Sequence, residues 1–152
     1  MLGPDQFPDT SEFRNRKLAF RLNKVIPSDP TLLVNTVGEI TAGLRRTPHW
    51  RDVEDIELVI GEALANAIVH GNHCDPEKTV HVVVAVNEHG DLLVSVKDSG
   101  SGFDPGRLPN PTAPENLLAP HGRGIFFIRQ LMDEVDFKFD HGTELRMRRR
   151  KR

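Results

Sequence analysis

The sequence predicts an α+β fold, a two-layer α/β sandwich in which helices cover one face of a mostly antiparallel sheet. Some segments alternate apolar and polar residues with the period of a strand, and others repeat apolar residues with the period of a helix. The predicted order is strand, helix, helix, two strands, a long proline-rich segment, helix and two strands. Consecutive strands joined by short turns form antiparallel hairpins, which leaves the helices to pack as a separate layer.

The composition is that of one globular domain. The chain has 152 residues, of which 38% are hydrophobic and 28% are charged, enough for a core of ordinary size. No apolar run is long enough to cross a bilayer, and residues 1–10 lack the pattern of a signal peptide. A single cysteine, Cys74, agrees with a reducing compartment. We therefore expect a cytoplasmic protein without a membrane partner.

The two ends of the chain differ in character from its middle. Residues 1–16 contain prolines and little apolar periodicity, which indicates a loose N-terminal arm. Residues 17–148 carry the periodic segments and form the predicted domain. Residues 149–152 are all basic, and we interpret them as a solubilising tail. The net charge of −2 argues against direct binding of nucleic acid.

Local signals predict the first two elements. Residues 18–23 alternate apolar and polar side chains, which predicts a strand that ends near Pro27. Ser28 or Asp29 can cap a helix that continues to about Leu44. This helix is amphipathic, since its apolar residues recur at spacings of three and four.

A second helix, beginning at Asp52, carries three polar residues on one face. Glu62, Asn66 and His70 are four residues apart, so each lies one turn beyond the last, about 6 Å along the axis. Two such side chains can bind one small ion or ligand, although a solvated polar stripe has the same spacing. The sequence Gly71-Asn72 is a natural terminator of this helix.

A hairpin formed by residues 80–86 and 92–97 ends in a carboxylate with an unexpected environment. The alternation places Asp98 on the same face as Leu92 and Val96, which is the apolar side of the strand. Burying this charge costs several kcal/mol unless a hydrogen-bond donor meets it. A ligand that donates a hydrogen bond to Asp98 is therefore a candidate partner.

A glycine-rich turn and a long irregular segment follow the hairpin. Gly100 and Gly102 free the backbone to turn sharply and to approach a ligand closely. Residues 104–120 contain many prolines and few apolar residues. So long an irregular segment within a small domain indicates a lid over a functional site.

The last part of the chain is predicted to form a helix and a hairpin. Residues 121–124 are rich in glycine and lead into a helix over residues 125–132. The free N–H groups and the dipole at the start of such a helix favour phosphate. Residues 135–139 and 145–147 alternate in the manner of two strands joined by a turn.

Four short motifs, in this order along the chain, resemble the nucleotide-binding boxes of the GHKL ATPase and kinase superfamily. They are Glu62-x-x-x-Asn66-Ala67, Asp98-x-Gly100-x-Gly102, Gly122-Arg123-Gly124 and Gly142-Thr143. Within that superfamily, residues 62–71 and 122–133 are most similar to the bacterial anti-sigma factor serine kinases. The resemblance extends over nearly the whole chain after about Lys17.

The resemblance implies the Bergerat fold, in which ATP lies between the helical layer and the sheet. It implies that Asn66 binds Mg²⁺ and that Glu62 is the general base for a serine hydroxyl. It also implies that Asp98 accepts a hydrogen bond from the adenine amino group. Further contacts with the nucleotide are implied for Gly100, Gly102, Gly122, Arg123, Gly124 and Thr143. His70 either contacts the nucleotide or caps the helix.

The function that the resemblance implies is that of an anti-sigma factor with ATP-dependent serine protein kinase activity. Such a protein sequesters a sigma factor and phosphorylates an anti-anti-sigma partner of the STAS type, so that transcription is regulated by partner switching. ATP and Mg²⁺ are the implied cofactors, and homodimers are common among proteins of this kind.

Three alternatives remain open. An ATP-binding regulatory module could capture its partner without kinase activity, although a pure binder has no need of Glu62 as a base. A detached histidine kinase domain usually has a different residue at that position and follows a helical pair with a phosphoacceptor histidine. A zinc site formed by His70, His73 and Cys74 lacks the usual paired spacing of ligands.

Overall fold

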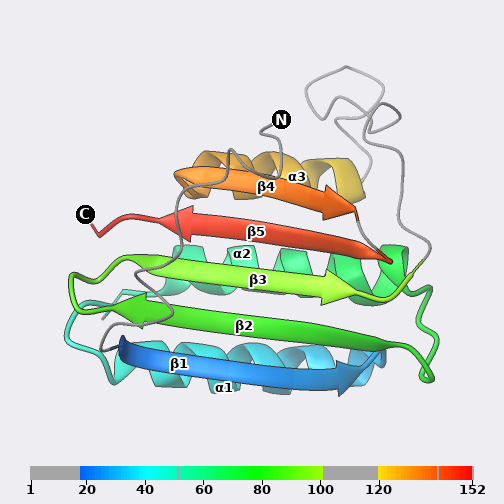
Figure 1. The fold of residues 1–152 in the computed structure, drawn as a ribbon, viewed down its shortest axis with the longest axis horizontal. Coiled ribbons are helices and arrows are strands. Elements are labelled where there is room, and N and C mark those ends of the chain that lie inside the picture. Colours follow the sequence, from blue (N-terminus) through cyan, green and yellow to red (C-terminus); the bar gives the residue numbers. More distant parts are fainter. Residues whose placement is uncertain (1–17, 51, 101–119, 140, 152) are drawn as a thin grey trace.

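The protein is a two-layer sandwich, seen in a computed structural model that describes residues 18–50, 52–100, 120–139 and 141–151. One layer is an antiparallel five-stranded sheet with the strand order β1-β2-β3-β5-β4. Helices α1, α2 and α3 form the other layer on one face of that sheet (Figure 1). The predicted fold class is therefore confirmed. The N-terminal arm, Gly102 and the predicted lid up to residue 119 lie outside the described residues.

The elements occur in the predicted order. The strands are β1 (Leu18–Pro27), β2 (Thr79–Asn87), β3 (Leu92–Asp98), β4 (Glu134–Phe139) and β5 (Thr143–Arg149). The helices are α1 (Leu33–Arg45), α2 (Glu54–Ala65) and α3 (Pro120–Leu131). A short 3-10 turn, Pro30–Leu32, precedes α1, and a π-helix, Asn66–Gly71, continues α2. Most boundaries differ from the predicted ones by a few residues only, as expected where local signals compete.

The segment between β1 and α1 distinguishes the two candidate caps. The Asp29 carboxylate accepts hydrogen bonds from the Thr31 backbone N–H at 2.9 Å and from the Thr31 hydroxyl at 2.8 Å. Pro30 occupies the first helical position, where its missing N–H costs nothing. Asp29 is therefore the cap, and Ser28 is buried and donates its hydroxyl hydrogen bond to the Lys78 carbonyl at 2.8 Å.

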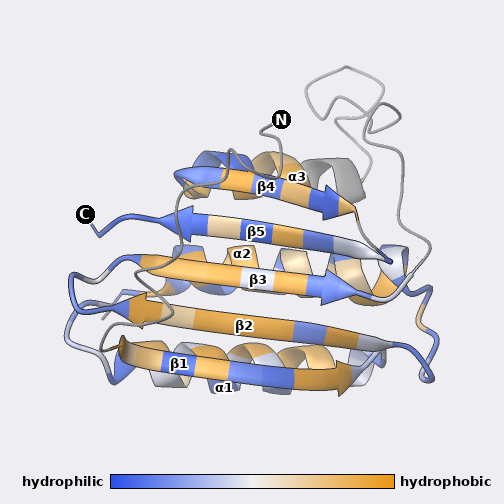
Figure 2. Cartoon of the chain, viewed as in Figure 1, coloured by the Kyte–Doolittle hydropathy of each residue, from blue (hydrophilic) through white to orange (hydrophobic). Residues whose placement is uncertain are grey.

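The core lies between the sheet and the helices. The inward face of β2 and β3 is lined by valines that are almost fully buried, and Figure 2 shows the apolar character of both central strands. The helices meet this face with branched side chains of equal burial, among them Ile40, Leu44, Ile60 and Leu64. Each such side chain contributes about 2 kcal/mol when it leaves water. No helix within the described ranges has the length and apolar character needed to span a bilayer.

The strand order could not be predicted from local patterns. β5 lies between β3 and β4, so the final hairpin turns back into the middle of the sheet. The register pairs Lys97 with Glu144, which brings Asp98 at the end of β3 beside Thr143 at the start of β5. Two of the predicted site residues meet in this way.

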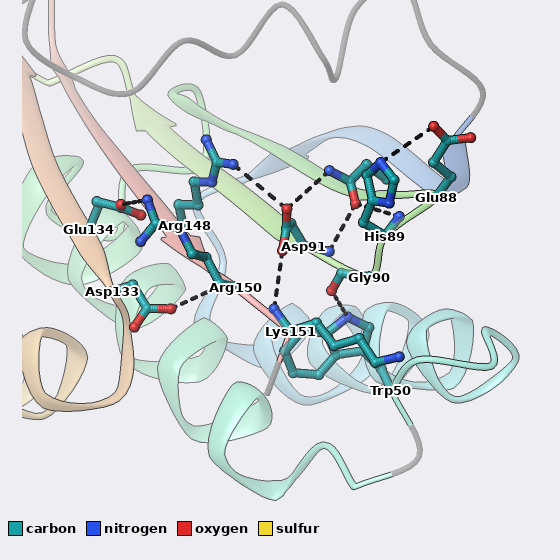
Figure 3. A network of polar contacts seen from close by, with 11 residues as sticks. Trp50, Glu88, His89, Gly90, Asp91, Asp133, Glu134, Arg148, Arg150 and Lys151 are labelled. Carbon is teal, nitrogen blue, oxygen red and sulfur yellow. Dashed lines mark hydrogen bonds and ion pairs between the residues drawn. The ribbon is translucent and has the colours of Figure 1, made fainter.

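The first of the C-terminal basic residues is part of this sheet. Arg149, which the sequence assigned to a free tail, is the last residue of β5 because the strand alternation continues through it. At the end of the sheet remote from Asp98, the Lys151 backbone N–H donates to Asp91 at 3.1 Å, and the Arg148 guanidinium lies 3.7 Å from the same carboxylate (Figure 3). These contacts attach the end of the chain to the hairpin between β2 and β3.

Candidate functional site

Glu62 and Asn66 both face the start of α3. Glu62 lies in α2, and Asn66 is the first residue of the π-helix. A methyl group added at Gly124 of α3 would lie 2.5 Å from Glu62 Oε2 and 3.7 Å from Asn66 Nδ2. Three predicted site residues are therefore neighbours, and only glycine fits at position 124 while Glu62 keeps this position.

The π-helix changes the predicted shape of this region. The sequence predicted a regular helix through His70, but the Asn72 N–H donates to the Ala67 carbonyl, five residues earlier, at 2.9 Å. π-Helical turns are rare in proteins as a whole, and those that do occur often lie at functional sites. Asn66 Nδ2 is buried here without a hydrogen-bond partner among the described residues. A buried polar atom without a partner is costly, so this amide is suited to a ligand.

The Glu62 and Asn66 side chains fit a hard cation. A carboxylate and an amide each offer an oxygen, which is the ligand atom that Mg²⁺ prefers. The amide oxygen and nitrogen of Asn66 can exchange by rotation of the side chain, so either can face the ion. By contrast, no three histidine, cysteine or acidic side chains of the described ranges, which include His70, His73 and Cys74, form a metal-binding cluster.

Asp98 is buried, as its strand register predicted, with only 6% of its surface exposed. Its Oδ1 accepts hydrogen bonds from the backbone N–H groups of Gly100 at 3.0 Å and Thr143 at 3.2 Å. Burial raises the pKa of this carboxyl group above its ordinary range, and the two backbone N–H groups partly oppose that shift. The protein therefore supplies donors for one oxygen, and no described residue donates a hydrogen bond to the other oxygen, Oδ2.

Gly71 allows the helical layer to contact this carboxylate closely. A methyl group at Gly71 would overlap Asp98 Oδ2, and one at Gly100 would overlap the Gly71 carbonyl oxygen. The helical segment ends at Gly71, as the sequence predicted, but Gly71 itself does not adopt a left-handed conformation. The left-handed residues are His73 and Cys74, with φ values of 53° and 56°. The glycine is needed for close approach to Asp98 and not for its backbone freedom.

The structure describes all but one of the remaining predicted site residues. Thr143 is buried beside Asp98, and its hydroxyl oxygen has no hydrogen-bond partner among the described residues. His70 is exposed in the last turn of the π-helix. Gly122 and Arg123 belong to the first turn of α3, which begins at Pro120 rather than after the glycines. Gly102 lies outside the described residues.

One residue of the site had no functional signal in the sequence. Asn72, predicted only as a terminator, is completely buried, and its side-chain oxygen accepts a hydrogen bond from the Ser99 N–H at 3.1 Å. The two residues are 27 positions apart. No pattern of local periodicity could have predicted this contact.

A separate recess at the other end of the sheet has a different character. It has a volume of about 650 Å³ and is lined by residues that include Trp50, Asp55 and Arg149. The Arg149 guanidinium lies 5.6 Å from the centre of the Trp50 ring, and its Nη1 lies 3.8 Å from Asp55. None of the predicted site residues that the structure describes lines this recess.

Comparisons with known proteins agree with this geometry. Residues 26–149 match the histidine kinase-like ATPase domain family. An anti-sigma F factor of Heyndrickxia coagulans is 31% identical over 108 residues, which cover 67% of this chain and 72% of that protein. An anti-sigma F factor of Geobacillus thermodenitrificans is 36% identical over 104 residues, covering 66% of this chain and 68% of the relative.

Two further similarities extend the comparison. The serine-protein kinase RsbW of Bacillus licheniformis is 32% identical over 104 residues, which cover 64% of each chain. A crystal structure of the RsbU and RsbW domains of a Mycobacterium tuberculosis protein has a TM-score of 0.63 at 18% identity, covering 87% of this chain and 32% of that one. At that identity the structural likeness bears on the fold alone.

The fold and the four motifs define a nucleotide-binding domain of the GHKL type. The chain belongs to the histidine kinase-like ATPase domain family and, within it, to the family of the anti-sigma F factors. The predicted resemblance to anti-sigma factor kinases is thus confirmed at the level of family.

We predict that Gly71→Ala disrupts the site while Gly61→Ala does not. The first methyl group overlaps the Asp98 carboxylate, whereas the second meets no atom within 4 Å on α2. Gly61→Ala should raise the free energy of unfolding by up to about 1 kcal/mol through helix propensity. Urea unfolding and nucleotide titration of both variants test this expectation. Unchanged stability and unchanged nucleotide binding in Gly71→Ala would show that the contact is not restrictive.

The raised pKa of Asp98 predicts the sign of a pH effect on stability. The folded carboxyl group keeps its proton at pH values where the unfolded one has lost it. Its contribution to the free energy of unfolding therefore falls as pH rises from the ordinary value of 3.8 through the raised folded pKa. Asp98→Asn removes this titration. Urea unfolding at several pH values should show the stability difference, wild type minus variant, declining with pH over that interval, and a rising difference would contradict the assignment.

Proposed function

We propose that this protein is an anti-sigma factor that uses ATP to phosphorylate a serine of an anti-anti-sigma partner of the STAS type and that sequesters a sigma factor. The observation that carries the proposal is the position of Glu62 and Asn66, one turn apart and both against Gly124. Family membership supports ATP-dependent kinase chemistry. The names of the relatives, anti-sigma F factor and serine-protein kinase, support the regulatory role and the serine substrate.

Asp98 and Thr143 form the adenine end of the proposed site. The free oxygen of Asp98 accepts a hydrogen bond from the amino group of the base, because its other oxygen already has two backbone donors. Thr143, whose backbone N–H donates to this carboxylate, has a buried hydroxyl that offers a second polar contact. Selectivity for adenine follows, since guanine presents a carbonyl oxygen where adenine presents an amino group.

Glu62, Asn66 and the start of α3 form the phosphate end. Asn66 holds Mg²⁺, which when bound neutralises charge on the phosphate groups. The backbone N–H groups at Gly122 and Gly124, with Arg123 between them, lie in the first turns of α3, where the helix dipole favours anions. These groups hold the phosphates in place for attack.

Glu62 is the general base in this proposal. Its carboxylate lies one turn before Asn66 and accepts the proton of the substrate serine as the serine oxygen forms a bond to the γ-phosphorus. The bond from the γ-phosphorus to the bridging oxygen breaks, and ADP leaves. Most of the rate enhancement in such a transfer comes from positioning and charge stabilisation.

Family membership also supports the proposed protein partners. We propose a cytoplasmic protein that binds a sigma factor when its anti-anti-sigma partner is phosphorylated, and that assembles as a homodimer. An ATP-binding module without kinase activity is the alternative, and the catalytic test below distinguishes the two.

We predict that Asn66→Ala and Glu62→Gln separate nucleotide binding from chemistry. Calorimetric titration with ATP, with and without Mg²⁺, should show that Asn66→Ala loses the Mg²⁺-dependent part of the affinity. Glu62→Gln should bind Mg²⁺-ATP within about threefold of wild type and lose about a hundredfold or more in phosphorylation rate. The rate is measured with a STAS-domain protein of the same organism and radiolabelled ATP, with the serine-to-alanine variant of that protein as control.

The outcomes distinguish the readings of the site. A folded wild-type protein that binds no ATP would contradict the proposal as a whole. Full phosphorylation by Glu62→Gln would exclude Glu62 as the base. Mg²⁺-dependent ATP binding without phosphorylation of any STAS-domain protein would favour the regulatory module without kinase activity.

A further inference from the structure

We propose that Asn72 is a positioning residue for adenine recognition, because it joins the π-helix to the ends of three strands beside Asp98. This inference deepens the proposed function and rests on it. Asn72 has no exposed surface, and it directly follows the π-helix. A fully buried amide has to satisfy its donors and its acceptor within the protein, so its partners define its role.

The Asn72 amide bonds three segments that are far apart in the sequence. Its Nδ2 donates to Ser28 Oγ at 2.7 Å and to the Thr79 carbonyl at 2.9 Å, and its Oδ1 accepts from the Ser99 N–H at 3.1 Å. Ser28 follows β1, Thr79 begins β2 and Ser99 follows β3. We call these four residues the Asn72 junction. Both N–H donors and the acceptor of the amide are used in it.

The Asn72 junction is continuous with the contacts of Asp98. Ser99 directly follows Asp98, and Gly71 directly precedes Asn72. Gly71 lies so close to the Asp98 carboxylate and to Gly100 that neither glycine has room for a methyl group. The hydrogen bond from the Ser99 N–H to Asn72 therefore joins the two segments that make this contact, the end of the π-helix and the end of β3.

The same residue also closes the π-helix. The Asn72 backbone N–H donates to the Ala67 carbonyl at 2.9 Å, across the turn that begins at Asn66. The side chain of Asn72 thus fixes the sheet end of the site while its backbone ends the wide turn that carries Asn66. Loss of the side chain leaves the Ser99 N–H and the Thr79 carbonyl without this partner and releases the Asp98 segment from the helix layer.

The test compares two nucleotides that differ only in the adenine amino group. Wild type and Asn72→Ala are titrated by calorimetry with Mg²⁺-ATP and with Mg²⁺-purine riboside triphosphate, which lacks that amino group. We expect the Kd for ATP to rise about tenfold in Asn72→Ala, the scale of one hydrogen bond. The Kd for the purine analogue should change much less, so that the selectivity ratio falls.

Asn87→Ala is the matched control. Asn87 is also a buried asparagine, with 2% exposure, and it lies at the opposite end of β2. Its Oδ1 accepts from the backbone N–H groups of His89 at 3.0 Å and Asp91 at 2.9 Å, within the hairpin seen in Figure 3. We expect Asn87→Ala to lower the Tm about as much as Asn72→Ala does and to leave the selectivity ratio unchanged.

Ser28→Ala provides a second and milder variant. It removes only one acceptor of the Asn72 amide, so it should lower the selectivity ratio in the same direction by a smaller factor. It keeps the proposal testable if Asn72→Ala does not fold. If Ser28→Ala folds but leaves the selectivity ratio at the wild-type value, the Asn72 junction has a structural role only.

The outcomes separate this inference from the proposed function. If wild type prefers ATP and Asn72→Ala loses stability but not selectivity, Asn72 does not position the adenine acceptor. If wild type binds both nucleotides equally, Asp98 is not that acceptor and the inference fails with it. If wild type binds neither nucleotide, the proposed function is itself contradicted.

Discussion

The buried carboxylate of Asp98 is the constraint on which the rest of the site depends. A charge at the apolar end of a strand is tolerated only where donors meet it, and here the Gly100 and Thr143 N–H groups do so. The second donor requires β5 to lie beside β3 in this register. The contact with Gly71 requires the helix layer to end at the same point. One polar group thus links the strand order of the sheet to the position of the helices.

The π-helix relates the two ends of the site to each other. Its first residue, Asn66, lies with Glu62 against α3, and its last residue, Gly71, lies against Asp98. If α2 continued as a regular α-helix, its turns between Asn66 and Gly71 would be narrower than those of the π-helix. In the proposed nucleotide site, the wider turn sets how far the adenine end lies from the phosphate end. A protein kinase that uses ATP depends on that spacing, because phosphoryl transfer is catalysed largely by positioning.

The comparisons and the site geometry support different parts of the functional conclusion. Sequence similarity over most of the chain establishes the family, and the solved structure at lower identity agrees on the fold. Neither assigns a role to a residue of this chain. That step rests on local chemistry: an amide and a carboxylate beside a helix start, and a buried acceptor with one oxygen free.

The sequence alone determined the elements, the fold class and the burial of Asp98, because each follows from periodicity within a short window. The motifs also identified Gly100 and Gly124, where close contacts leave no room for a methyl group, but they did not include Gly71. Only the tertiary structure decided the strand order, the π-helix and the hydrogen bonds of Asn72. The Asn72–Ser28 and Asp98–Thr143 hydrogen bonds join residues 44 and 45 positions apart. Such contacts depend on which strands become neighbours, and a local pattern carries no information about that choice.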